Sequence, residues 1–332
     1  FEMLGNFTFG DYFKKEAISY AWEFVTQVIK LPTDKLWASV FQDDQEAYDL
    51  WIAAGVPKER IVRLTAKDNF WGPAGDSGAC GPCSEIYIDR GPEAAKVGWE
   101  GKPCTEQDCK PGCDCDRYLE FWNLVFMQYF QEPDGSRRPL AKTGIDTGMG
   151  LERLAMIVQD VDNVYETDLF RPIIQEIWNQ MGSDSPRPLP EKLPRAQQIA
   201  LNCVADHARA LVFSIGDGGV PSNEGRGYVL RRILRRAVRF AKTLGLDRPF
   251  MYMLVHKIVE QYQDQYPEIR DRREHIATTI QAEEESFHNT LRRGMDLLVE
   301  YIEELKTTKQ GTLSGEKAFF LHDTHGFPID LT

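Results

Sequence analysis

No run of apolar residues in this chain is long enough to span a bilayer, and no signal peptide opens it. A soluble globular protein with no membrane partner is therefore expected. An excess of positive charge is also missing, because 51 acidic residues against 39 basic ones give a formal net charge of -12. This balance excludes a surface that binds nucleic acid everywhere, so any nucleic-acid site must be a local basic patch. Without a secretion signal, the seven cysteines, an odd number, favour free thiols in a reducing cytoplasm over a disulfide framework.

The chain also lacks the usual markers of nucleotide binding. The stretch GIDTGMGLERLAMIVQ, residues 144–159, places two glycines between an apolar approach and an amphipathic run. No Gly-Lys-Ser/Thr follows, and the third glycine of a dinucleotide fingerprint is absent. One interpretation is a structural glycine turn with Glu152 near the positive end of a helix. The other is a ligand lying on the glycine backbone, with Asp146 facing a cation and Arg153 facing a phosphate or a base.

Strand and helix patterns alternate in the first half of the chain. Residues 11–30 have apolar positions at helical spacing with Asp11 as the predicted N-cap, and residues 43–55 predict a short helix that ends at Gly55. Strands are predicted at four places, residues 36–41, 60–65, 84–89 and 119–130. The last of these is apolar enough to be covered on both faces. This half therefore predicts a mixed α/β fold.

A proline-rich stretch, SDSPRPLPEKLP at residues 183–194, marks a change of composition. Beyond it the periodicity is helical, at residues 195–215, 226–244, 250–263 and 276–307. A chain of 332 residues is long enough for about two domains. We therefore predict one domain at 1–182 and a second at 183–332.

Three stretches of the first half carry glycines beside aromatic or charged residues: FEMLGNFTFGDYF at 1–13, DNFWGPAGDSGACGPCSEIYID at 68–89 and DTGMGLER at 146–153. Alone, the aromatic residues of the first stretch would be assigned to a core. Together with PSNEGRGYVLRRILRRAVR at 221–239 and HDTHGFPIDLT at 322–332, however, these stretches resemble the alanyl-tRNA synthetases, members of the class II aminoacyl-tRNA synthetases. The resemblance runs from Phe1 to Thr332.

The resemblance implies an amino-acid site. Asp146 matches the family's acid that holds the ammonium group of the amino acid, and Gly148 matches the glycine that lines the small side-chain pocket. Trp71 and Asn123 match residues that surround the bound amino acid. Val125 is expected to form a wall of the pocket.

The resemblance also implies an ATP site and a two-step reaction. Met3 and its neighbour Glu2 match residues beside the adenine, Arg153 matches the arginine that stacks on the adenine or reaches the phosphates, and Glu85 is a candidate for holding Mg²⁺. The carboxylate of alanine attacks the α-phosphate of ATP, pyrophosphate leaves, and the 3′-terminal ribose hydroxyl of tRNA(Ala) takes the aminoacyl group. Because these steps need positioning and cations but no covalent nucleophile, no Ser-His-Asp or Cys-His set is expected.

By resemblance, residues 1–182 are a class II antiparallel-sheet catalytic domain and residues 183–332 are an all-α tRNA-recognition domain. Motif 1 and the motif 2 arginine are expected upstream of FEMLGN, and the editing domain downstream of Thr332. The activity of this stretch alone is therefore open. The alternative to an alanine–tRNA ligase is a noncatalytic RNA-binding remnant, and a third hypothesis is a paralogue that activates another small carboxylate. The oligomeric state is left open.

A basic run stands out in the acidic chain, because residues 226–242 contain seven Arg or Lys and no Asp or Glu. At about 100° per residue the cations cover an arc of about 140° on a helix; they are Arg231, Arg232, Arg235, Arg236, Arg239 and Lys242. One interpretation is a solvated face paired with the acidic helix at 276–307. The other is contact with the phosphates of an RNA stem. By resemblance, Asn223 and Asp323 match the pair that reads the G·U wobble pair in the acceptor stem of tRNA(Ala), with Arg235 in support.

Six of the seven cysteines fall between residues 80 and 115. Four of them lie close together in the loop CTEQDCKPGCDC, namely Cys104, Cys109, Cys113 and Cys115. Four close thiols can hold Zn²⁺ tetrahedrally, although this spacing is not a standard finger pattern. The alternatives are a structural zinc site and free thiols in an insertion. Cys203 is expected to be an ordinary buried thiol.

Overall fold

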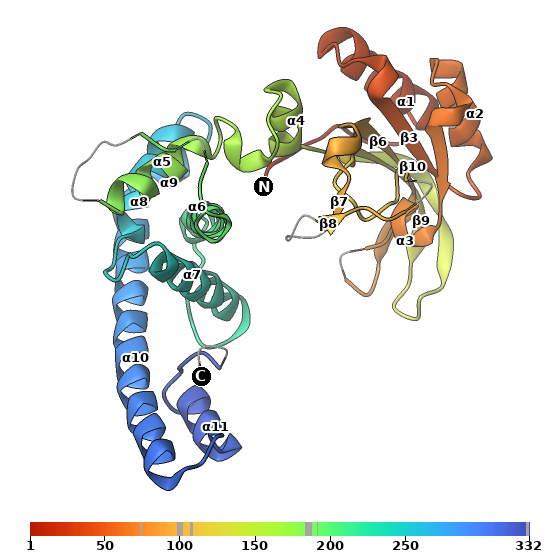
Figure 1. The fold of residues 1–332 in the computed structure, drawn as a ribbon. Helices are drawn as coiled ribbons and strands as arrows, with labels where there is room; N and C mark the ends of the chain where they lie inside the picture. The colour runs from red at the N-terminus through yellow and green to blue at the C-terminus, as the bar shows by residue number, and fades with distance from the viewer. Residues whose placement is uncertain (74, 98–101, 107–108, 183–187, 191, 330–331) are drawn as a thin grey trace. The chain divides into compact units, whose positions relative to one another are not determined.

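The computed structural model describes residues 1–73, 75–97, 102–106, 109–182, 188–190, 192–329 and 332. The chain divides into two compact units, Phe1–Asp160 and Val161–Thr332. The first, the sheet unit, contains all the described strands, and the described elements of the second, the helical unit, are helices (Figure 1). The division falls before the boundary predicted at 182/183, because helix α5, Arg171–Gln180, buries Ile173 and Ile177 in the core of the helical unit. Residues 183–187 and 191 of the proline-rich stretch lie outside the described residues.

The main sheet of the sheet unit has the order β1–β10–β9–β6–β3–β4, with β2 beside β10 and β5 beside β6. Its strands are β1 Met3–Leu4, β2 Phe7–Phe9, β3 Leu36–Phe41, β4 Ile61–Leu64, β5 Phe70–Trp71, β6 Gly78–Asp89, β9 Tyr118–Gln131 and β10 Arg137–Gly150. All its pairs are antiparallel except β3 with β4. The two short strands β7, Lys96–Val97, and β8, Lys102–Pro103, pair with each other. The four predicted strands are confirmed, and the segment 84–89 is the second half of the longer β6.

The main helices of the sheet unit are α1, Lys14–Glu23, which continues as the π-helical turn Phe24–Val28, and α2, Gln45–Ala54. They pack against the sheet through a shared apolar core that includes Ile18, Trp51 and Leu124. The predicted N-cap at Asp11 is wrong, because the first helical residue of α1 is Lys14. The predicted end of α2 at Gly55 is confirmed, and there φ is 102°, a left-handed conformation that glycine adopts easily. The shorter helices are α3, Ala66–Asn69, and α4, Leu151–Val158, with 3₁₀ turns at Thr33–Lys35, Lys58–Arg60 and Pro92–Ala94.

The stretch around residues 144–159 forms no glycine turn. Gly148 and Gly150 lie in strand β10, which leads directly into α4, because this end of β10 is paired with β9 on one side and with β1 on the other. At Gly144 the pairing requires glycine, since an added Cβ would lie 2.5 Å from the carbonyl oxygen of Thr8. At Gly148 the added Cβ would lie 3.4 Å from the sulfur of Met3, an ordinary contact.

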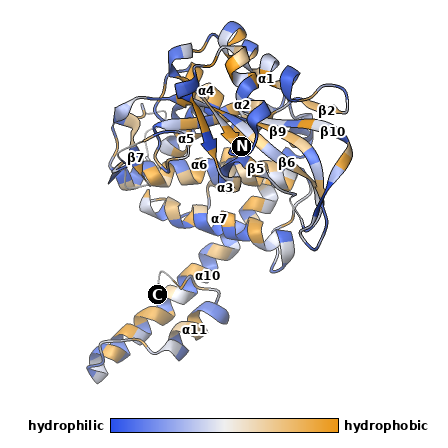
Figure 2. Cartoon of the chain, turned by 90° about the vertical axis from the view of Figure 1, so that its right-hand side faces the viewer, coloured by the Kyte–Doolittle hydropathy of each residue, from blue (hydrophilic) through white to orange (hydrophobic). Residues whose placement is uncertain are grey.

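The helical unit contains α5, α6 Arg195–Gly216, α7 Gly225–Thr243, α8 Met251–Tyr262, α9 Pro267–Asp271, α10 Arg273–Thr308 and α11 Gly315–Asp323, with a 3₁₀ turn at Val164–Glu166. The four helices predicted beyond residue 194 are confirmed as α6, α7, α8 and α10. In Figure 2 hydrophobic and hydrophilic residues alternate along α7 and α10, as expected for helices that bury one face.

Among the described residues, α6 is long and apolar enough to cross a membrane by length and composition. This corrects the expectation that no segment of the chain reaches that threshold. However, 61% of its apolar window is buried, and Leu201, Val204 and Leu211 belong to the core of the helical unit. A core helix passes the same test of length and composition, so α6 is explained by its packing.

Helix α8 has no side-chain cap from its own N-cap residue, Phe250. The cap comes from Glu284 of α10, whose side chain is fully buried. Its carboxylate accepts hydrogen bonds from the backbone N–H groups of Phe250 at 3.0 Å and Met251 at 3.1 Å. Burial raises the pKa of Glu284 to about 7. These two hydrogen bonds join α10 to the start of α8.

Candidate functional site

One row of residues crosses four strands of the sheet unit. Gly148 of β10 is paired with Asn123 of β9, Asn123 with Glu85 of β6, and Glu85 with Ser39 of β3. Residues directly opposite one another in antiparallel strands point to the same face of a sheet. The three side chains, and the space above the glycine, therefore share one face.

A second row lies two residues away on the same strands. Asp146 of β10 is paired with Val125 of β9, and Val125 with Cys83 of β6. Since side chains alternate along a strand, a step of two residues returns to the same face. Asp146 is half-buried, and burial raises the pKa of its carboxyl group. The structure thus brings the predicted residues Asp146, Gly148, Asn123 and Val125 together on one face.

Glu85 holds Asn123 in place. Its side chain is only 5% exposed, and its Oε1 accepts a hydrogen bond from Nδ2 of Asn123 at 3.2 Å. Its Oε2 accepts from the hydroxyls of Ser39, at 3.2 Å, and Tyr87. Because both oxygens are engaged inside the protein, these contacts do not fit the predicted role of Glu85 as a Mg²⁺ ligand. They fit a positioning role toward Asn123.

The start of the chain lies beside this face. Met3 is paired with Gly150 and is 59% exposed, with its sulfur next to Gly148. The backbone of Glu2 is fixed on both sides, since its N–H donates to the buried carboxylate of Glu152 at 3.0 Å and its carbonyl accepts from the N–H of Leu151. The backbone of Met3 is therefore anchored, while its side chain is accessible to a ligand.

Three of the five aromatic residues of the first stretch are exposed, whereas Tyr12 and Phe13 pack against the core of the sheet unit, so the core assignment suggested by their pattern is confirmed only for the last two. Phe1 is 88% exposed, Phe7 59% and Phe9 91%. Trp71 is 39% exposed in β5, which is paired with β6 at Gly81. Glycine is required there, because an added Cβ would lie 1.8 Å from the carbonyl oxygen of Phe126. Gly81 lies where the pairing of β6 with β9 is irregular, between Cys80 and Cys83. The strand that carries Trp71 therefore joins the sheet at this irregularity.

Arg153, expected at the ATP site, is engaged with β9 in this structure. Its Nη1 donates to the backbone carbonyl of Glu120 at 2.6 Å and to the Glu120 carboxylate at 3.3 Å. Both side chains are partly exposed, so the ion pair is weak and open to competition from a phosphate. Glu120 also raises the pKa of Glu85, after the larger effect of burial.

In the helical unit, the basic residues of α7 border a groove of about 690 Å³. Its lining includes Arg231, Arg232, Arg235, Arg236 and Arg239, with Tyr228 and residues of the segment after α11. The opposite side of α7 is buried through Leu234, Ala237, Val238 and Ala241. The predicted basic face of α7 is therefore confirmed.

The pairing of that basic face with the acidic helix is confirmed for two of its arginines, and contact with an RNA stem stays a prediction. Glu283 of α10 pairs with Arg231 at 2.8 Å and with Arg235 at 3.6 Å, as expected for pairing with the acidic helix. Arg232 and Arg236 are exposed and face outward. Arg231 also donates to the side-chain oxygen of Asn223, so Glu283 holds Asn223 through that arginine.

Asp323 is the last residue of α11 and is exposed. His207 donates a hydrogen bond from Nδ1 to the carboxylate of the adjacent Asp206 at 3.0 Å. Cys203 is only partly buried, which corrects the expectation of a buried thiol, and its burial still raises its pKa to about 11.

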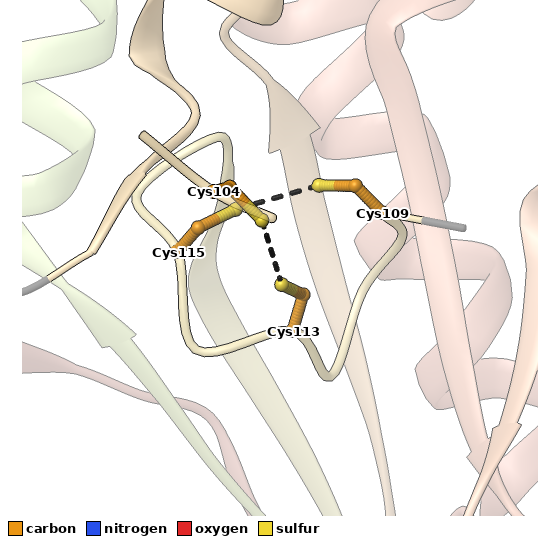
Figure 3. Close-up of side chains that lie close together, drawn as sticks. All are labelled: Cys104, Cys109, Cys113 and Cys115. Carbon is orange, nitrogen blue, oxygen red and sulfur yellow. Dashed lines mark hydrogen bonds between the residues drawn. The ribbon is translucent and has the colours of Figure 1, made fainter. Parts of the chain in front are cut away.

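The four cysteines of the loop converge on one point, as Figure 3 shows. The sulfurs of Cys104 and Cys113 are 3.6 Å apart, those of Cys109 and Cys115 are 3.4 Å apart, and all four lie within 4.8 Å of one another. All four are free thiols. Burial is the main cause that raises the pKa of Cys109 to about 12 and that of Cys113 to about 11.

Comparison with known proteins identifies the family. A family model described as tRNA synthetases class II (A) matches residues 1–332. The chain belongs to this family. It is 50% identical to the alanine–tRNA ligase of Leptospira biflexa over 333 residues, 49% identical to that of Alkaliphilus oremlandii and 47% identical to that of Desulforamulus reducens. All of this class II synthetase chain is covered in each comparison, but it spans only 35–36% of the length of these relatives.

Several residues around the class II synthetase sites were not singled out from the sequence. They are Ser39, Tyr87, Glu120 and Glu283, each of which contacts a predicted site residue. A signal for Glu120 was present, because an acid inside the apolar strand LEFWNLVF needs a partner. Ser39 and Glu283 carry no such signal, since their contacts depend on tertiary pairing.

Proposed function

We propose that this chain contains the alanine-activating site and part of the tRNA-binding surface of an alanine–tRNA ligase. The observation that carries the proposal is the shared face of β9 and β10, where Asp146, Gly148, Asn123 and Val125 meet. A half-buried carboxylate beside a glycine fits a small substrate with an ammonium group and a short side chain. The named relatives support alanine as that substrate.

In this proposal the Asp146 carboxylate binds the ammonium group of alanine, and the methyl group lies above Gly148, beside the flexible side chain of Met3. Asn123, oriented by Glu85, holds the substrate so that its carboxylate can attack the α-phosphate of ATP. Pyrophosphate leaves, and the adenylate forms without a covalent bond to the protein. Because a methyl pocket excludes larger side chains by size but not smaller ones, discrimination against glycine is expected to be poor.

ATP enters with Mg²⁺ as a substrate, and we assign the adenine to the neighbourhood of Met3 and Glu2. A phosphate can displace Glu120 from Arg153, since that pair is partly exposed. The oxygens of Glu85 are already engaged, so we assign no Mg²⁺ ligand among the described residues of this face. None of these steps uses the four thiols, so Zn²⁺ bound there would have a structural role.

For tRNA(Ala), we propose that the groove on α7 receives the phosphates of the acceptor stem. Arg232 and Arg236 are exposed and suited to direct phosphate contact, with Arg239 on the same side of α7. Asn223 and Asp323 are both exposed and can read the free guanine amino group of a G·U pair in the minor groove. The free thiols fit a reducing compartment, and we propose the cytoplasm.

The experiment is alanine-dependent ATP–pyrophosphate exchange. It is run on the chain itself and on a chimera in which residues 1–332 replace the matching segment of the Leptospira biflexa relative. The chimera supplies the remainder of the longer relative, so a missing neighbouring segment cannot hide the activity. Exchange with alanine, and none with valine, is the expected result for the chimera.

Absence of exchange in the chimera, together with tRNA binding by the helical unit, would contradict the proposal and favour the noncatalytic RNA-binding protein. Exchange with another small carboxylate but not with alanine would favour the paralogue that ignores tRNA. Exchange in the chimera alone would place residues needed for activity outside this stretch.

A further inference from the structure

The described residues of the connection between β6 and β9, residues 90–117, form almost no apolar core. Among its described residues only Pro111 and Cys115 are buried, and Val97 is 38% exposed. The strands β7 and β8 within it have two residues each. A segment this poor in buried apolar surface needs another source of order.

In the β6–β9 connection the four thiols come together in place of a cluster of apolar side chains. Disulfide sulfurs are about 2.05 Å apart, and the closest thiol pairs here are separated by 3.4 and 3.6 Å. Tetrahedral Zn²⁺ has Zn–S bonds of about 2.3 Å, which places its sulfur ligands about 3.8 Å from one another. The observed separations therefore match a shared ion better than a pair of disulfides.

Backbone contacts position three of the four thiols, each from a different part of the connection. The N–H of Cys104 donates to the carbonyl of Ala95 at 2.8 Å, and Cys115 forms a β-bridge with Val97. Between them the N–H of Cys113 closes a turn on the carbonyl of Lys110 at 3.0 Å. Gly112, inside that turn, has φ of 93°, which a glycine adopts without strain.

The two ends of the connection are joined to each other next to the cysteine cluster. Arg117 forms two hydrogen bonds of 2.8 Å with the two carboxylate oxygens of Asp89, the last residue of β6. The N–H of Arg90 donates to the carbonyl of Arg117 at 2.9 Å. Arg117 is two residues from Cys115 and directly precedes β9, so the cluster and the ion pair together fix the start of the strand that carries Asn123.

We propose that Cys104, Cys109, Cys113 and Cys115 bind one Zn²⁺ as thiolates, and that this ion fixes the β6–β9 connection and the start of β9. With four protein ligands the site has no open position for a substrate, so its role is structural. Binding exchanges the four thiol protons for one Zn²⁺. The inference does not depend on the proposed reaction, because the ion is measured without alanine, ATP or tRNA.

The test is the metal content of the purified chain, measured by inductively coupled plasma mass spectrometry, in wild type and in Cys104→Ser and Cys113→Ser. Cys203→Ser, in the helical unit, is the matched control. We expect one zinc per chain in the wild type and the control, and loss of zinc in the two cluster variants. Co²⁺ bound to the metal-free wild type should give thiolate charge-transfer bands that Zn²⁺ abolishes.

The cobalt titration needs only the wild-type chain, so it remains decisive if a serine variant fails to fold. Absence of both zinc and the cobalt–thiolate bands, in a chain expressed with zinc supplied, would overturn the proposal. Iron in place of zinc would overturn the choice of ion, and zinc retained in both cluster variants would overturn the choice of ligands. Removal of the ion by a chelator should lower the unfolding midpoint followed by tryptophan fluorescence.

Discussion

The buried carboxyl group of Glu85 predicts how the free energy of unfolding changes with pH, both in direction and in magnitude. Burial first, and then the charge of Glu120, raise the pKa of Glu85 from 4.5 to about 7, despite the hydrogen bonds from Tyr87 and Ser39, which lower it. Because the folded-state pKa is above the unfolded value, the folded chain binds more protons between these two pH values. This contribution to stability is fully present below pH 4.5 and is lost as the pH rises through about 7.

The change to test is Glu85→Gln, which keeps the shape and removes the titration. At about 1.4 kcal/mol per pH unit, the raised pKa corresponds to about 3 kcal/mol. The free energy of unfolding of the variant relative to wild type should therefore rise by up to about 3 kcal/mol between about pH 4 and pH 8. Urea unfolding followed by tryptophan fluorescence measures this, because six of the seven tryptophans lie in residues 1–160.

Parallel curves of stability against pH for the two proteins would refute the reasoning. The same residue gives a functional readout, because in the proposed site it reaches the substrate only through Asn123. Glu85→Ala removes one hydrogen bond to Asn123 and should raise the KM for alanine about tenfold in the exchange assay, whereas Glu85→Gln should restore it. An equal KM in the two variants would show that Glu85 does not position Asn123.

The other sites give three shorter predictions. Asp146→Ala should abolish alanine-dependent exchange. The control Asp134→Ala, in the exposed turn between β9 and β10, should leave exchange intact. Exchange that survives the loss of Asp146 would show that this residue does not bind the ammonium group. Asn223→Ala or Asp323→Ala should spare exchange and impair charging of a G·U-bearing tRNA, and unchanged charging in both would contradict the base-pair assignment. Glu284→Ala removes the cap of the first turn of α8 and leaves a cavity beside it. The free energy of unfolding, followed by helical ellipticity, should fall by about 3 kcal/mol. A loss below about 1 kcal/mol would contradict the capping role.

The regular elements were predictable where periodicity is strong. Strand β3 begins and ends where the apolar run LWASVF does, and α10 extends the predicted helix 276–307 by a few residues at its start. The two-residue strands β5, β7 and β8 were not predicted, because two residues carry no period. The supposed glycine turn failed for a different reason: strand pairing on both sides overrides the turn preference of glycine at 148 and 150.

The candidate site could be named from the sequence but not assembled from it. Which residues of β6, β9 and β10 lie opposite one another depends on irregularities between Cys80 and Cys83 and between Pro139 and Gly144. A slip of one residue would have sent Asn123 to the opposite face of the sheet. Similarly, the pairing of Arg153 with Glu120 joins positions 33 residues apart, so neither partner predicts the other.

A glycine can be needed because the fold has no room for a side chain, or because a ligand needs that room. The contacts at Gly148 distinguish these two reasons. At Gly81 and Gly144 the chain itself has no room for a side chain, because a Cβ would strike a carbonyl oxygen. At Gly148 the backbone tolerates a Cβ, whose nearest neighbour is the flexible side chain of Met3. Enlarging this residue should therefore reshape the substrate preference without unfolding the protein, which makes position 148 an adjustable point for engineering an enzyme that accepts glycine in place of alanine.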